Sequence, residues 1–287
     1  MTFQSLGLIE ALLKAVRLQG YETPSPIQQK AIPPILEGLD VLASAQTGTG
    51  KTAAFSLPIL HRLDTSLTKP QVLILSPTRE LGIQIAKNIE GYTKHLPKVN
   101  SVAVYGGASI DGQIRTIKRG VHVVVGTPGR TLDLIRRKKL DFSNIKWLVL
   151  DEADEMLDMG FLDDINEIFS YLPTNRQTLL FSATMPQPIK TLASRILDNP
   201  EFISITKGET TNTDIEQLYY VIEESERDDA IIRLMDSEET QKSVVFCRTK
   251  SEVDRLSNVL SNAGYLANGL HGDMEQRQRE NVIKGFK

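Results

Sequence analysis

The stretch Ala45-Gln46-Thr47-Gly48-Thr49-Gly50-Lys51-Thr52 follows a short apolar run at 41–43 and precedes a segment that can form a helix. A glycine-bearing turn between a strand and a helix exposes consecutive backbone N–H groups, and the helix start adds its dipole, so the arrangement binds phosphate. Gly48 and Gly50 permit backbone angles and a close approach that a Cβ would prevent. The stretch therefore predicts a phosphate-binding loop whose eight residues contact a nucleotide.

Two side chains at the end of this loop support the prediction of a nucleotide phosphate site. Lys51 can reach the β- and γ-phosphates, and the Thr52 hydroxyl can ligate Mg²⁺. The strict pattern of such loops begins with Gly, whereas this chain has Ala45. The alternative is a Gly- and Thr-rich turn without a ligand, but the strand context and the Gly-Lys-Thr ending favour the phosphate-binding loop.

Composition indicates a globular protein with more than one domain. The chain has 287 residues, of which 40% are hydrophobic and 24% are charged, and this length favours two α/β units, or one and a fraction. Its single cysteine, Cys247, excludes an internal disulfide and fits a reducing compartment. The four histidines are scattered without metal-ligand spacing, so we expect no zinc or iron site.

The N-terminal sequence and the lengths of the apolar runs suggest a cytoplasmic protein, and the distribution of charge bears on its partners. Apolar positions near the N-terminus recur at helical spacing, unlike those of a signal peptide, and no apolar run is long enough to span a bilayer. The net charge is −3. Residues 208–287 carry 10 Lys and Arg against 16 Asp and Glu, and the remainder carries 23 against 20. The mildly basic first part is only weak support for nucleic-acid binding.

Apolar runs alternate with amphipathic stretches from about residue 40 onward, which predicts a mostly parallel sheet with helices on both faces. Runs such as 121–125 are nearly continuously apolar, as expected when both faces of a strand are covered. Ligands of such folds bind at the carboxyl ends of the strands. The expected strands are Asp40–Ala45, Val72–Ser76, Ser101–Tyr105, Val121–Gly126, Lys146–Leu150, Gln177–Phe181 and Phe202–Ile205. The expected helices include Glu80–His95, Arg130–Lys138, Phe161–Tyr171 and Pro188–Leu197.

A polar stretch without periodicity divides the chain. It predicts a first domain at 1–207, a linker at 208–214 and a second, partial α/β domain at 215–287. In the second domain three strands should alternate with three helices, which makes a thin sheet. The expected strands there are Ile215–Ile222, Ser243–Cys247 and Leu266–Leu270, and the expected helices are Arg227–Asp236, Lys250–Asn262 and Gln276–Phe286.

A second candidate site follows the buried-strand pattern at 147–150. Asp151 and Glu152 stand at the end of that strand, and Asp154 follows closely. Beside a phosphate-binding loop, one carboxylate can hold Mg²⁺, partly through water, and the next can orient and deprotonate an attacking water. We assign Asp151 to the metal and Glu152 to the base. An acidic helix start is the alternative, since carboxylates favour that end of the helix dipole. Together with the loop, however, the pair predicts a nucleoside triphosphatase.

Two hydroxyl groups follow the next expected strand. Ser182 and Thr184 could hydrogen-bond to Asp154 and so report the nucleotide state to another surface. A Ser or Thr after a strand is commonly a turn or cap residue, so this triplet alone is uninformative.

The motif Asp151-Glu152-Ala153-Asp154, together with the phosphate-binding stretch, resembles the DEAD-box ATP-dependent RNA helicases, with a bacterial type of organisation. The similarity extends along nearly the whole chain. It implies a RecA-like P-loop domain followed by a partial second RecA-like domain. It also implies ATP and Mg²⁺ as cofactors and RNA as the partner.

The stretch 20–28 resembles the adenine-recognition motif of this family. A glutamine amide can pair with the adenine edge, and an aromatic ring can stack on the base. The resemblance implies that Gln28 selects ATP and that Phe3 covers the base, with Tyr21 beside them. A Pro-rich turn before a helix describes the same backbone.

Three short stretches resemble the RNA-contacting motifs of the first domain. Hydroxyl groups, backbone amides at helix starts and arginines are ligands of phosphate and sugar. Their composition implies sequence-independent backbone binding, and contacts to the 2′-OH would select RNA over DNA. Each stretch alone could be an ordinary loop turn. The residues concerned are Pro77, Thr78, Arg79, Gly106, Gly107, Thr127, Pro128, Gly129 and Arg130.

In the second domain the resemblance implies RNA-backbone contacts by Arg248, Thr249 and Gly272. The family's later motifs, including an arginine that reaches the γ-phosphate, do not occur before Lys287. We therefore expect a truncated chain with weak RNA-stimulated turnover, because such arginines contribute roughly 10³–10⁵ to the rate.

Two other functions stay open at this stage. One is an ATP-gated RNA clamp or scaffold that does not hydrolyse its nucleotide, and the other is a related P-loop DNA translocase. Ribosome-assembly and RNA-decay proteins are candidate partners, and no membrane partner is expected.

Overall fold

The computed structural model describes residues 2–205, 216–237 and 242–286. The chain divides into two compact units, Met1–Glu209 and Thr210–Lys287, and each is described by itself. The linker predicted at 208–214 lies outside the described residues. Among the helices that are described, none is long and apolar enough to cross a lipid bilayer.

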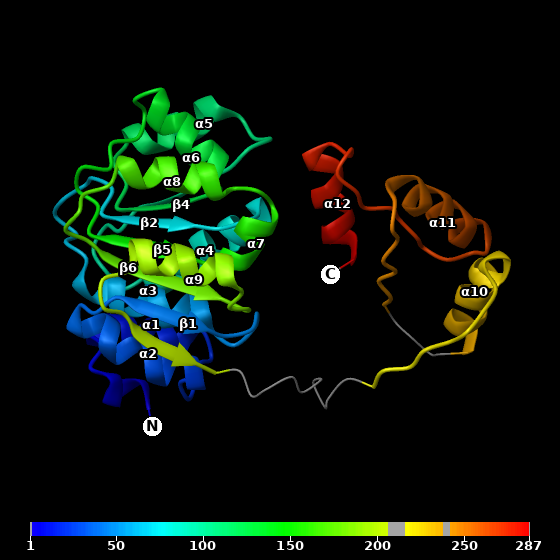
Figure 1. Ribbon diagram of the computed structural model, residues 1–287, viewed down its shortest axis with the longest axis horizontal. Helices are drawn as coiled ribbons and strands as arrows, with labels where there is room; N and C mark the ends of the chain where they lie inside the picture. The colour runs from blue at the N-terminus through cyan, green and yellow to red at the C-terminus, as the bar shows by residue number, and fades with distance from the viewer. Residues whose placement is uncertain (1, 206–215, 238–241, 287) are drawn as a thin grey trace. The chain divides into compact units, whose positions relative to one another are not determined.

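The first unit contains one seven-stranded sheet in which all neighbouring strands are parallel (Figure 1). The strand order is β3-β4-β2-β5-β6-β1-β7. The seven predicted strands are confirmed, and their ends differ from the prediction by at most two residues, as is usual where a strand meets a loop. Their bounds are β1 (Val41–Ser44), β2 (Val72–Leu75), β3 (Ser101–Val104), β4 (Val123–Gly126), β5 (Trp147–Leu150), β6 (Gln177–Ser182) and β7 (Glu201–Ser204).

Helices cover both faces of this sheet, which confirms the predicted α/β class. One face packs against the short helix η1 (Phe3–Leu6) and helices α1 (Glu10–Leu18), α2 (Pro26–Glu37), α3 (Lys51–Arg62) and α4 (Arg79–Tyr92). The other face packs against α5 (Ile110–Lys118), α6 (Pro128–Arg136), α7 (Ala153–Asp158), α8 (Leu162–Ser170) and α9 (Gln187–Ile196).

Strand periodicity divides the core into two apolar clusters. Val72 and Ile74 of β2 belong to the cluster under α1–α4, whereas Leu73 and Leu75 belong to the cluster under α6–α9. Successive side chains of a strand point to opposite faces. Strands such as β2 and β4, which are covered on both sides, are therefore apolar throughout, and this made them recognisable in the sequence.

Gln177, the first residue of β6, joins several elements near the amino ends of the strands. Its Nε2 donates to the carbonyl oxygens of Ile35, at 3.1 Å, and Leu39, at 2.6 Å. Its Oε1 accepts from Trp147 Nε1 at 3.0 Å and from Arg62 Nη1 at 3.3 Å. This one amide thus ties the ends of α2 and α3 to β5 and β6 in a largely buried network.

Asp40, immediately before β1, makes a second connection at the same edge. Its Oδ1 accepts the N–H of Thr178 at 2.7 Å, and its Oδ2 accepts the N–H of Asp198 at 2.8 Å. Burial raises the pKa of Asp40, and the two N–H groups oppose that rise. The carboxylate therefore holds β1 against β6 and against the chain that leads into β7.

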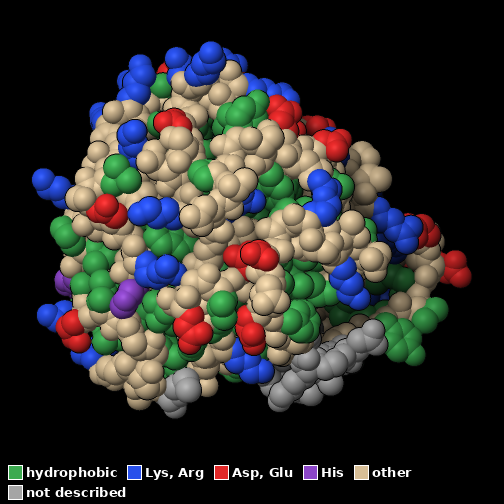
Figure 2. Space-filling view, turned by 60° about the vertical axis from the view of Figure 1, so that its left-hand side comes forward, with side chains coloured by type: hydrophobic (Ala, Val, Ile, Leu, Met, Phe, Trp, Pro, Cys, Tyr) green, Lys and Arg blue, Asp and Glu red, His purple; other side chains and the backbone are tan. Residues whose placement is uncertain are grey.

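Basic side chains are concentrated at one margin of the face drawn in Figure 2 and are also scattered over the rest of it. On the face drawn in Figure 2, Lys and Arg side chains gather at the upper margin, at the height of α5 and α6 in Figure 1. Asp and Glu side chains are distributed over the rest of that face. This mixed surface agrees with the small net charge of the whole chain.

The second unit contains the three predicted helices: α10 (Arg227–Ser237), α11 (Lys250–Asn262) and α12 (Gln276–Phe286). The short helix η2 (Glu224–Glu226) precedes α10. The three predicted strands are wrong, because residues 216–237 and 242–286 contain no strand. The side chains of Tyr219 and Phe246 are 89% and 91% exposed. An apolar run becomes a strand only when a neighbouring strand satisfies its backbone groups, and these runs have no such neighbour.

Candidate nucleotide and RNA site

The phosphate-binding stretch forms the connection between β1 and α3. Gly48 and Gly50 have φ angles of 83° and 95°, in the left-handed region that favours glycine. The loop begins at Ala45, which is fully buried and donates its N–H to the Ser182 carbonyl oxygen at 3.0 Å. Ala45 needs no left-handed backbone, so its methyl group is accommodated in the core. The departure from the strict glycine pattern therefore leaves the loop geometry intact.

Lys51 and Asp151 face each other below this loop. Lys51 Nζ lies 3.9 Å from Asp151 Oδ1, and the two side chains are only 5% and 2% exposed. Neither of these atoms has a hydrogen-bond partner among the described residues. Burial raises the pKa of Asp151 to about 6, and the positive charge of Lys51 opposes that rise. Because the Lys51 ammonium and the Asp151 carboxylate are buried without hydrogen bonds, the ammonium can still bind a phosphate oxygen and the carboxylate can still bind a cation.

The residues at this position fit a magnesium ion that is held mainly by the nucleotide. Mg²⁺ is commonly bound through one or two protein groups, with phosphate oxygens and waters completing its shell. Asp151 follows β5, and Thr52 lies in the first turn of α3, so both side chains come from ends of elements beside the loop. Within the described ranges, no group of three or more His, Cys, Asp or Glu side chains could hold a metal ion.

Glu152 occupies an unusual backbone position at the start of α7. Its φ angle is 54°, in the left-handed region that costs a non-glycine residue about 1 kcal/mol or more. Its Oε1 accepts a hydrogen bond from Thr47 Oγ1 at 3.1 Å. A strained backbone at the carboxyl end of a strand is common at functional sites. Here it places the carboxylate beside the phosphate-binding loop.

Asp154, Ser182 and Thr184 meet between α7 and the end of β6. Asp154 Oδ2 accepts hydrogen bonds from the Thr184 hydroxyl at 2.8 Å and from the Thr184 N–H at 2.9 Å. The Ser182 hydroxyl accepts the N–H of Asp154 at 3.3 Å. Asp154 is partly buried, which raises its pKa, but these hydrogen bonds outweigh burial and hold the pKa below its ordinary value. Since Ser182 also bonds to Ala45, the cluster contacts the phosphate loop directly.

Gln28 contacts the phosphate-binding loop in this structure. Its Nε2 donates to the Gly50 carbonyl oxygen at 3.1 Å, and its Oε1 accepts the N–H of Ser25 at 2.9 Å. Ser25 and Gln28 form a capping box at the start of α2. Ser25 was not identified from the sequence, although Ser-x-x-Gln before an apolar run is a recognisable capping signal.

The two aromatic residues expected near the base form a packed pair. Phe3 is only 5% exposed, and its ring stacks on that of Tyr21 with a centroid distance of 6.4 Å. The Tyr21 hydroxyl lies 3.4 Å from that of the buried Tyr92. Most of the Phe3 ring is thus covered by the protein itself, and Tyr21 is the more accessible of the two.

The three stretches expected to contact RNA lie after β2, β3 and β4, at the carboxyl edge of the sheet. Pro77 and Thr78 precede α4, and the Thr78 hydroxyl accepts the Leu81 N–H at 3.3 Å. Gly106 follows β3, and a Cβ on Gly107 would lie 2.1 Å from Arg79 Nη1. Arg79 therefore lies against the backbone after β3, which joins the first two stretches.

The third stretch begins α6. Thr127 is its N-cap residue, Pro128 occupies the first turn, and Gly129 approaches Asp164. Arg130 Nη1 donates to the Ala108 carbonyl oxygen at 3.3 Å and to Gln113 Oε1 at 3.1 Å. Gln113 was not identified from the sequence, because nothing local marks a glutamine on a helix as the partner of a distant arginine.

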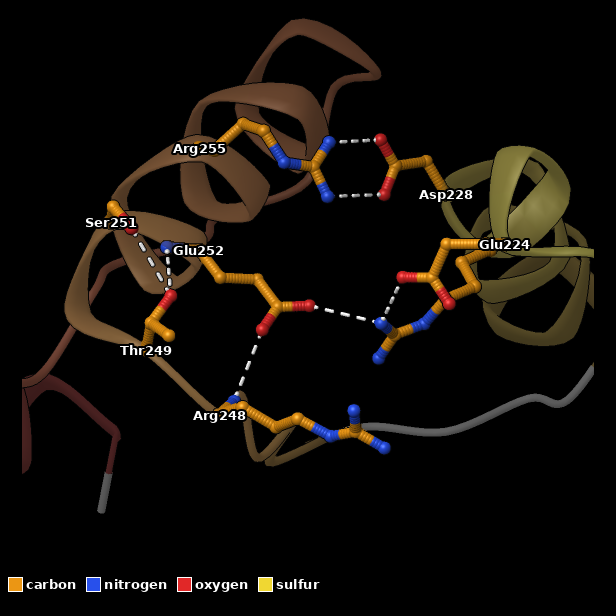
Figure 3. Close-up of polar contacts among 8 residues, drawn as sticks. Glu224, Asp228, Arg248, Thr249, Ser251, Glu252 and Arg255 are labelled. Carbon is orange, nitrogen blue, oxygen red and sulfur yellow. Dashed lines mark hydrogen bonds and ion pairs between the residues drawn. The ribbon is translucent and has the colours of Figure 1, made fainter.

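Arg248 and Thr249 precede α11 in the second unit (Figure 3). The Thr249 hydroxyl accepts the N–H of Glu252 at 3.2 Å, and the Arg248 N–H donates to Glu252 Oε2 at 3.1 Å. Glu252 also pairs with Arg227 at 3.2 Å, and Arg255 Nη2 donates to Asp228 Oδ1 at 2.9 Å.

These contacts fix the start of α11 and join it to α10. The guanidinium of Arg248 extends away from this network. Gly272, the third residue expected to bind RNA in this unit, has Lys250 Cε 4.0 Å from the position of an added Cβ. The side chain of Lys250, the first residue of α11, thus approaches Gly272.

A phosphate-binding loop beside two strand-end carboxylates, on a parallel sheet, defines a RecA-like nucleotide-binding protein. The profile described as DEAD/DEAH box helicase matches residues 25–192, and that described as Helicase conserved C-terminal domain matches residues 226–287. The chain belongs to the DEAD/DEAH box helicase family.

Two curated relatives are similar over essentially all of the chain. The DEAD-box ATP-dependent RNA helicase RhpA of Helicobacter pylori is 52% identical over 100% of the chain. The ATP-dependent RNA helicase CshA of Listeria monocytogenes is 48% identical over 99% of it. The chain spans 58% and 55% of the lengths of these relatives.

Solved structures show the same fold. A DEAD box protein from Methanococcus jannaschii matches with a TM-score of 0.69 and 41% identity, covering 100% of this chain and 77% of the other. Dbp5 of S. cerevisiae, bound to RNA and ADP BeF3, matches with a TM-score of 0.89 and 34% identity. That match covers 99% of this chain and 73% of Dbp5.

Proposed function

We propose that the protein is an ATP-dependent RNA helicase that binds single-stranded RNA through its backbone and couples ATP binding and hydrolysis to local duplex separation. The observation that carries this proposal is the buried Lys51–Asp151 pair below the loop, with Glu152 next to it. Family membership and the RNA-bound relative support the choice of RNA. The reaction is ATP and water to ADP and phosphate.

Each residue of the phosphate site has a distinct role in this proposal. Lys51 and the backbone N–H groups of the loop bind the β- and γ-phosphates, and Gln28 and Tyr21 lie toward the adenine. Asp151 and Thr52 hold Mg²⁺, which neutralises phosphate charge when bound. Glu152 orients the attacking water and accepts its proton. The strain at Glu152 fits that role, because it fixes the direction of the carboxylate.

The RNA side of the proposal uses the carboxyl edge of the sheet. Thr78, Arg79, Gly107, Thr127 and Arg130 supply hydroxyl groups, cations and open backbone, which suit phosphate and sugar rather than base edges. Asp154 and Thr184 link the phosphate site to this edge through β6 and α7. Arg248, Thr249 and Gly272 contribute further RNA contacts from the second unit.

We further propose a cytoplasmic location and proteins of ribosome assembly or RNA decay as partners. The reducing compartment inferred from the single cysteine supports the location. Backbone-directed RNA contacts suit substrates of many sequences, as both of these processes require.

Phosphate release from ATP, measured with and without single-stranded RNA, tests the proposed function. We expect RNA to raise the rate weakly in this chain, and Glu152→Gln to remove hydrolysis while ATP still binds. An equal response to single-stranded DNA would instead favour a DNA translocase. Binding of RNA and ATP without phosphate release, with or without RNA, would favour a clamp. Lys51→Ala is the control that should lose nucleotide affinity.

A further inference from the structure

A surface hollow of about 360 Å³ lies at the far end of α6, where the chain turns toward β5. Helix α6 begins at the carboxyl end of β4, and residue 146, after the turn, enters the amino end of β5. The hollow is therefore at the opposite edge of the sheet from the phosphate-binding loop. Ligands of parallel α/β folds bind at the carboxyl edge, so this hollow is separate from the site described above.

The floor and wall of the hollow are apolar. Ile135, Leu140 and Phe142 line it and are themselves buried in the core under α6–α9, so its floor is part of a packed interior. Tyr171, which follows α8, stands at the edge and is 46% exposed. A hollow with this lining accepts an apolar or aromatic side chain from another molecule.

A run of four exposed basic residues, 136–139, lies at the hollow, and two of them, Arg136 and Lys138, line it. Arg136 is neutralised by a two-point pair with Glu167, at 2.8 Å and 2.5 Å, and Arg137 by Asp133 at 2.7 Å. Lys138 and Lys139 make no ion pair within the part of the chain that the structure describes.

The acidic residue at the rim is already engaged by its own loop. Asp141 Oδ1 accepts the N–H of Ser143 at 2.9 Å, and that contact is the main reason why the pKa of Asp141 is below its ordinary value. Asp141 therefore stays ionised, and Lys138 together with its neighbour Lys139 leaves an excess of positive charge beside the apolar hollow.

We propose that this hollow binds an acidic peptide segment of a partner protein. One apolar or aromatic side chain of the segment enters the hollow, and neighbouring carboxylates pair with Lys138 and Lys139. Charge complementarity selects the acidic partner, and the apolar floor supplies an anchor of the kind that dominates peptide affinity.

An RNA strand fits this surface less well than a peptide. Single-stranded RNA is held by successive stacking platforms along a basic groove. Among the residues that line the hollow, Tyr171 is the one exposed ring, and the two arginine guanidinium groups are occupied by carboxylates. Binding of RNA at this hollow would therefore contradict the proposal.

The backbone at Lys138 permits a clean substitution. Its φ angle is 55°, and its N–H donates to the Ile135 carbonyl oxygen at 2.7 Å in the turn that ends α6. Glycine is the favoured residue at such a position, so Lys138→Gly removes the charge without straining the fold. Lys98 is also exposed, has a φ angle of 48° and does not line the hollow. Lys98→Gly is therefore a control matched in charge and backbone.

The probe is a fluorescent synthetic peptide of Glu and Asp residues with one central Trp, titrated with the protein in fluorescence anisotropy. We expect saturable binding that Lys138→Gly weakens about threefold and Lys138→Gly with Lys139→Gln weakens further, while Lys98→Gly leaves it unchanged. Replacing the central Trp by Ser, or the carboxylates by amides, should each weaken binding.

Three results would overturn the proposal. One is no saturable binding of the acidic peptide, and another is an equal effect of Lys98→Gly and Lys138→Gly. The third is a loss of single-stranded RNA binding in Lys138→Gly with peptide binding preserved, which would assign the lysines to RNA. None of these readouts depends on ATP hydrolysis, so a failure of the proposed enzymatic function would be distinguishable.

Discussion

The Thr47 hydroxyl donates a hydrogen bond of 3.1 Å to the Glu152 carboxylate, although the two residues are 105 positions apart in the chain. Thr47 belongs to the phosphate-binding loop, and Glu152 is the residue that precedes α7. The contact joins the loop that would hold the phosphates to the group that would accept the proton of water. Glu152 has a left-handed backbone, so this contact and the backbone together set the direction of its side chain.

Thr47→Val should slow ATP hydrolysis about tenfold with little change in ATP affinity. The substitution frees the Glu152 carboxylate to turn away from the attacking water, and a tenfold loss of rate corresponds to about 1.4 kcal/mol of activation free energy. Thr47→Ser keeps the hydroxyl and should retain most of the rate. Single-turnover hydrolysis and nucleotide titration separate the two effects. Equal losses of affinity in both variants would assign Thr47 to nucleotide binding instead.

Glu152→Gly should raise the melting temperature while it removes hydrolysis. Glycine relieves the left-handed strain of about 1–2 kcal/mol, and water can replace the exposed hydrogen bond from Thr47 that is lost. Glu152→Gln also removes hydrolysis but keeps the strain, so its melting temperature should stay near that of the original protein. Thermal unfolding measures both variants, and a lower melting temperature of the glycine variant would show that Glu152 is a stabilising cap.

Asp40→Ala should lower the free energy of unfolding of the first unit by about 2–4 kcal/mol, because it leaves the buried N–H of Thr178 and the partly buried N–H of Asp198 unpaired. The measurement is urea denaturation followed by fluorescence. Asp64→Ala is the control, since that carboxylate also accepts a backbone N–H, from Ser66 at 2.9 Å, but is exposed. Similar losses in the two variants would contradict the assigned role of Asp40.

The contribution of Asp40 should also depend on pH. Burial raises its pKa in the folded protein above the ordinary value of 3.8, so ionisation is less favourable in the folded chain than in the unfolded chain. The contribution is therefore fully present below 3.8 and declines as the pH rises through the folded pKa. In a pH series, the advantage of the original protein over Asp40→Asn should shrink in that direction. An advantage that grows with pH would show that the pKa is lowered.

Gln177→Ala should destabilise the first unit by about 2–3 kcal/mol, because the Trp147 indole N–H and the Leu39 carbonyl oxygen lose their partner. Trp147 is the single tryptophan of the chain, so its emission reports directly on this network. We expect a shifted emission maximum and a lower melting temperature. Gln84→Ala, at an exposed position of α4, is the matched control. Equal destabilisation in the two variants would contradict the stabilising role of the Gln177 network.

Local patterns in the sequence were sufficient to predict the sheet of the first unit and the positions of its candidate site. Strands such as β2 and β4 are apolar at every position because both of their faces are covered. The phosphate loop and the carboxylates were recognisable because their spacing is local and because both follow buried strands.

Contacts between distant residues were not predictable in the same way. The Asp40 and Gln177 connections join positions 138 residues apart, and no local pattern marks them. The strands expected in the second unit failed for a related reason. Runs such as 243–247 have strand-like composition, but composition cannot supply the neighbouring strand that pairs with them.

The pairing of β7 with β1 has a mechanical consequence. The Glu201 N–H donates to the Asp40 carbonyl oxygen at 2.8 Å, and the Ile205 N–H donates to the Ser44 carbonyl oxygen at 2.9 Å. Ser44 is the last residue before the phosphate-binding stretch, and β7 is the last strand before the chain leaves the first unit. Tension on the chain beyond Ile205 would therefore load these bonds in shear and act first on the strand that carries the phosphate loop.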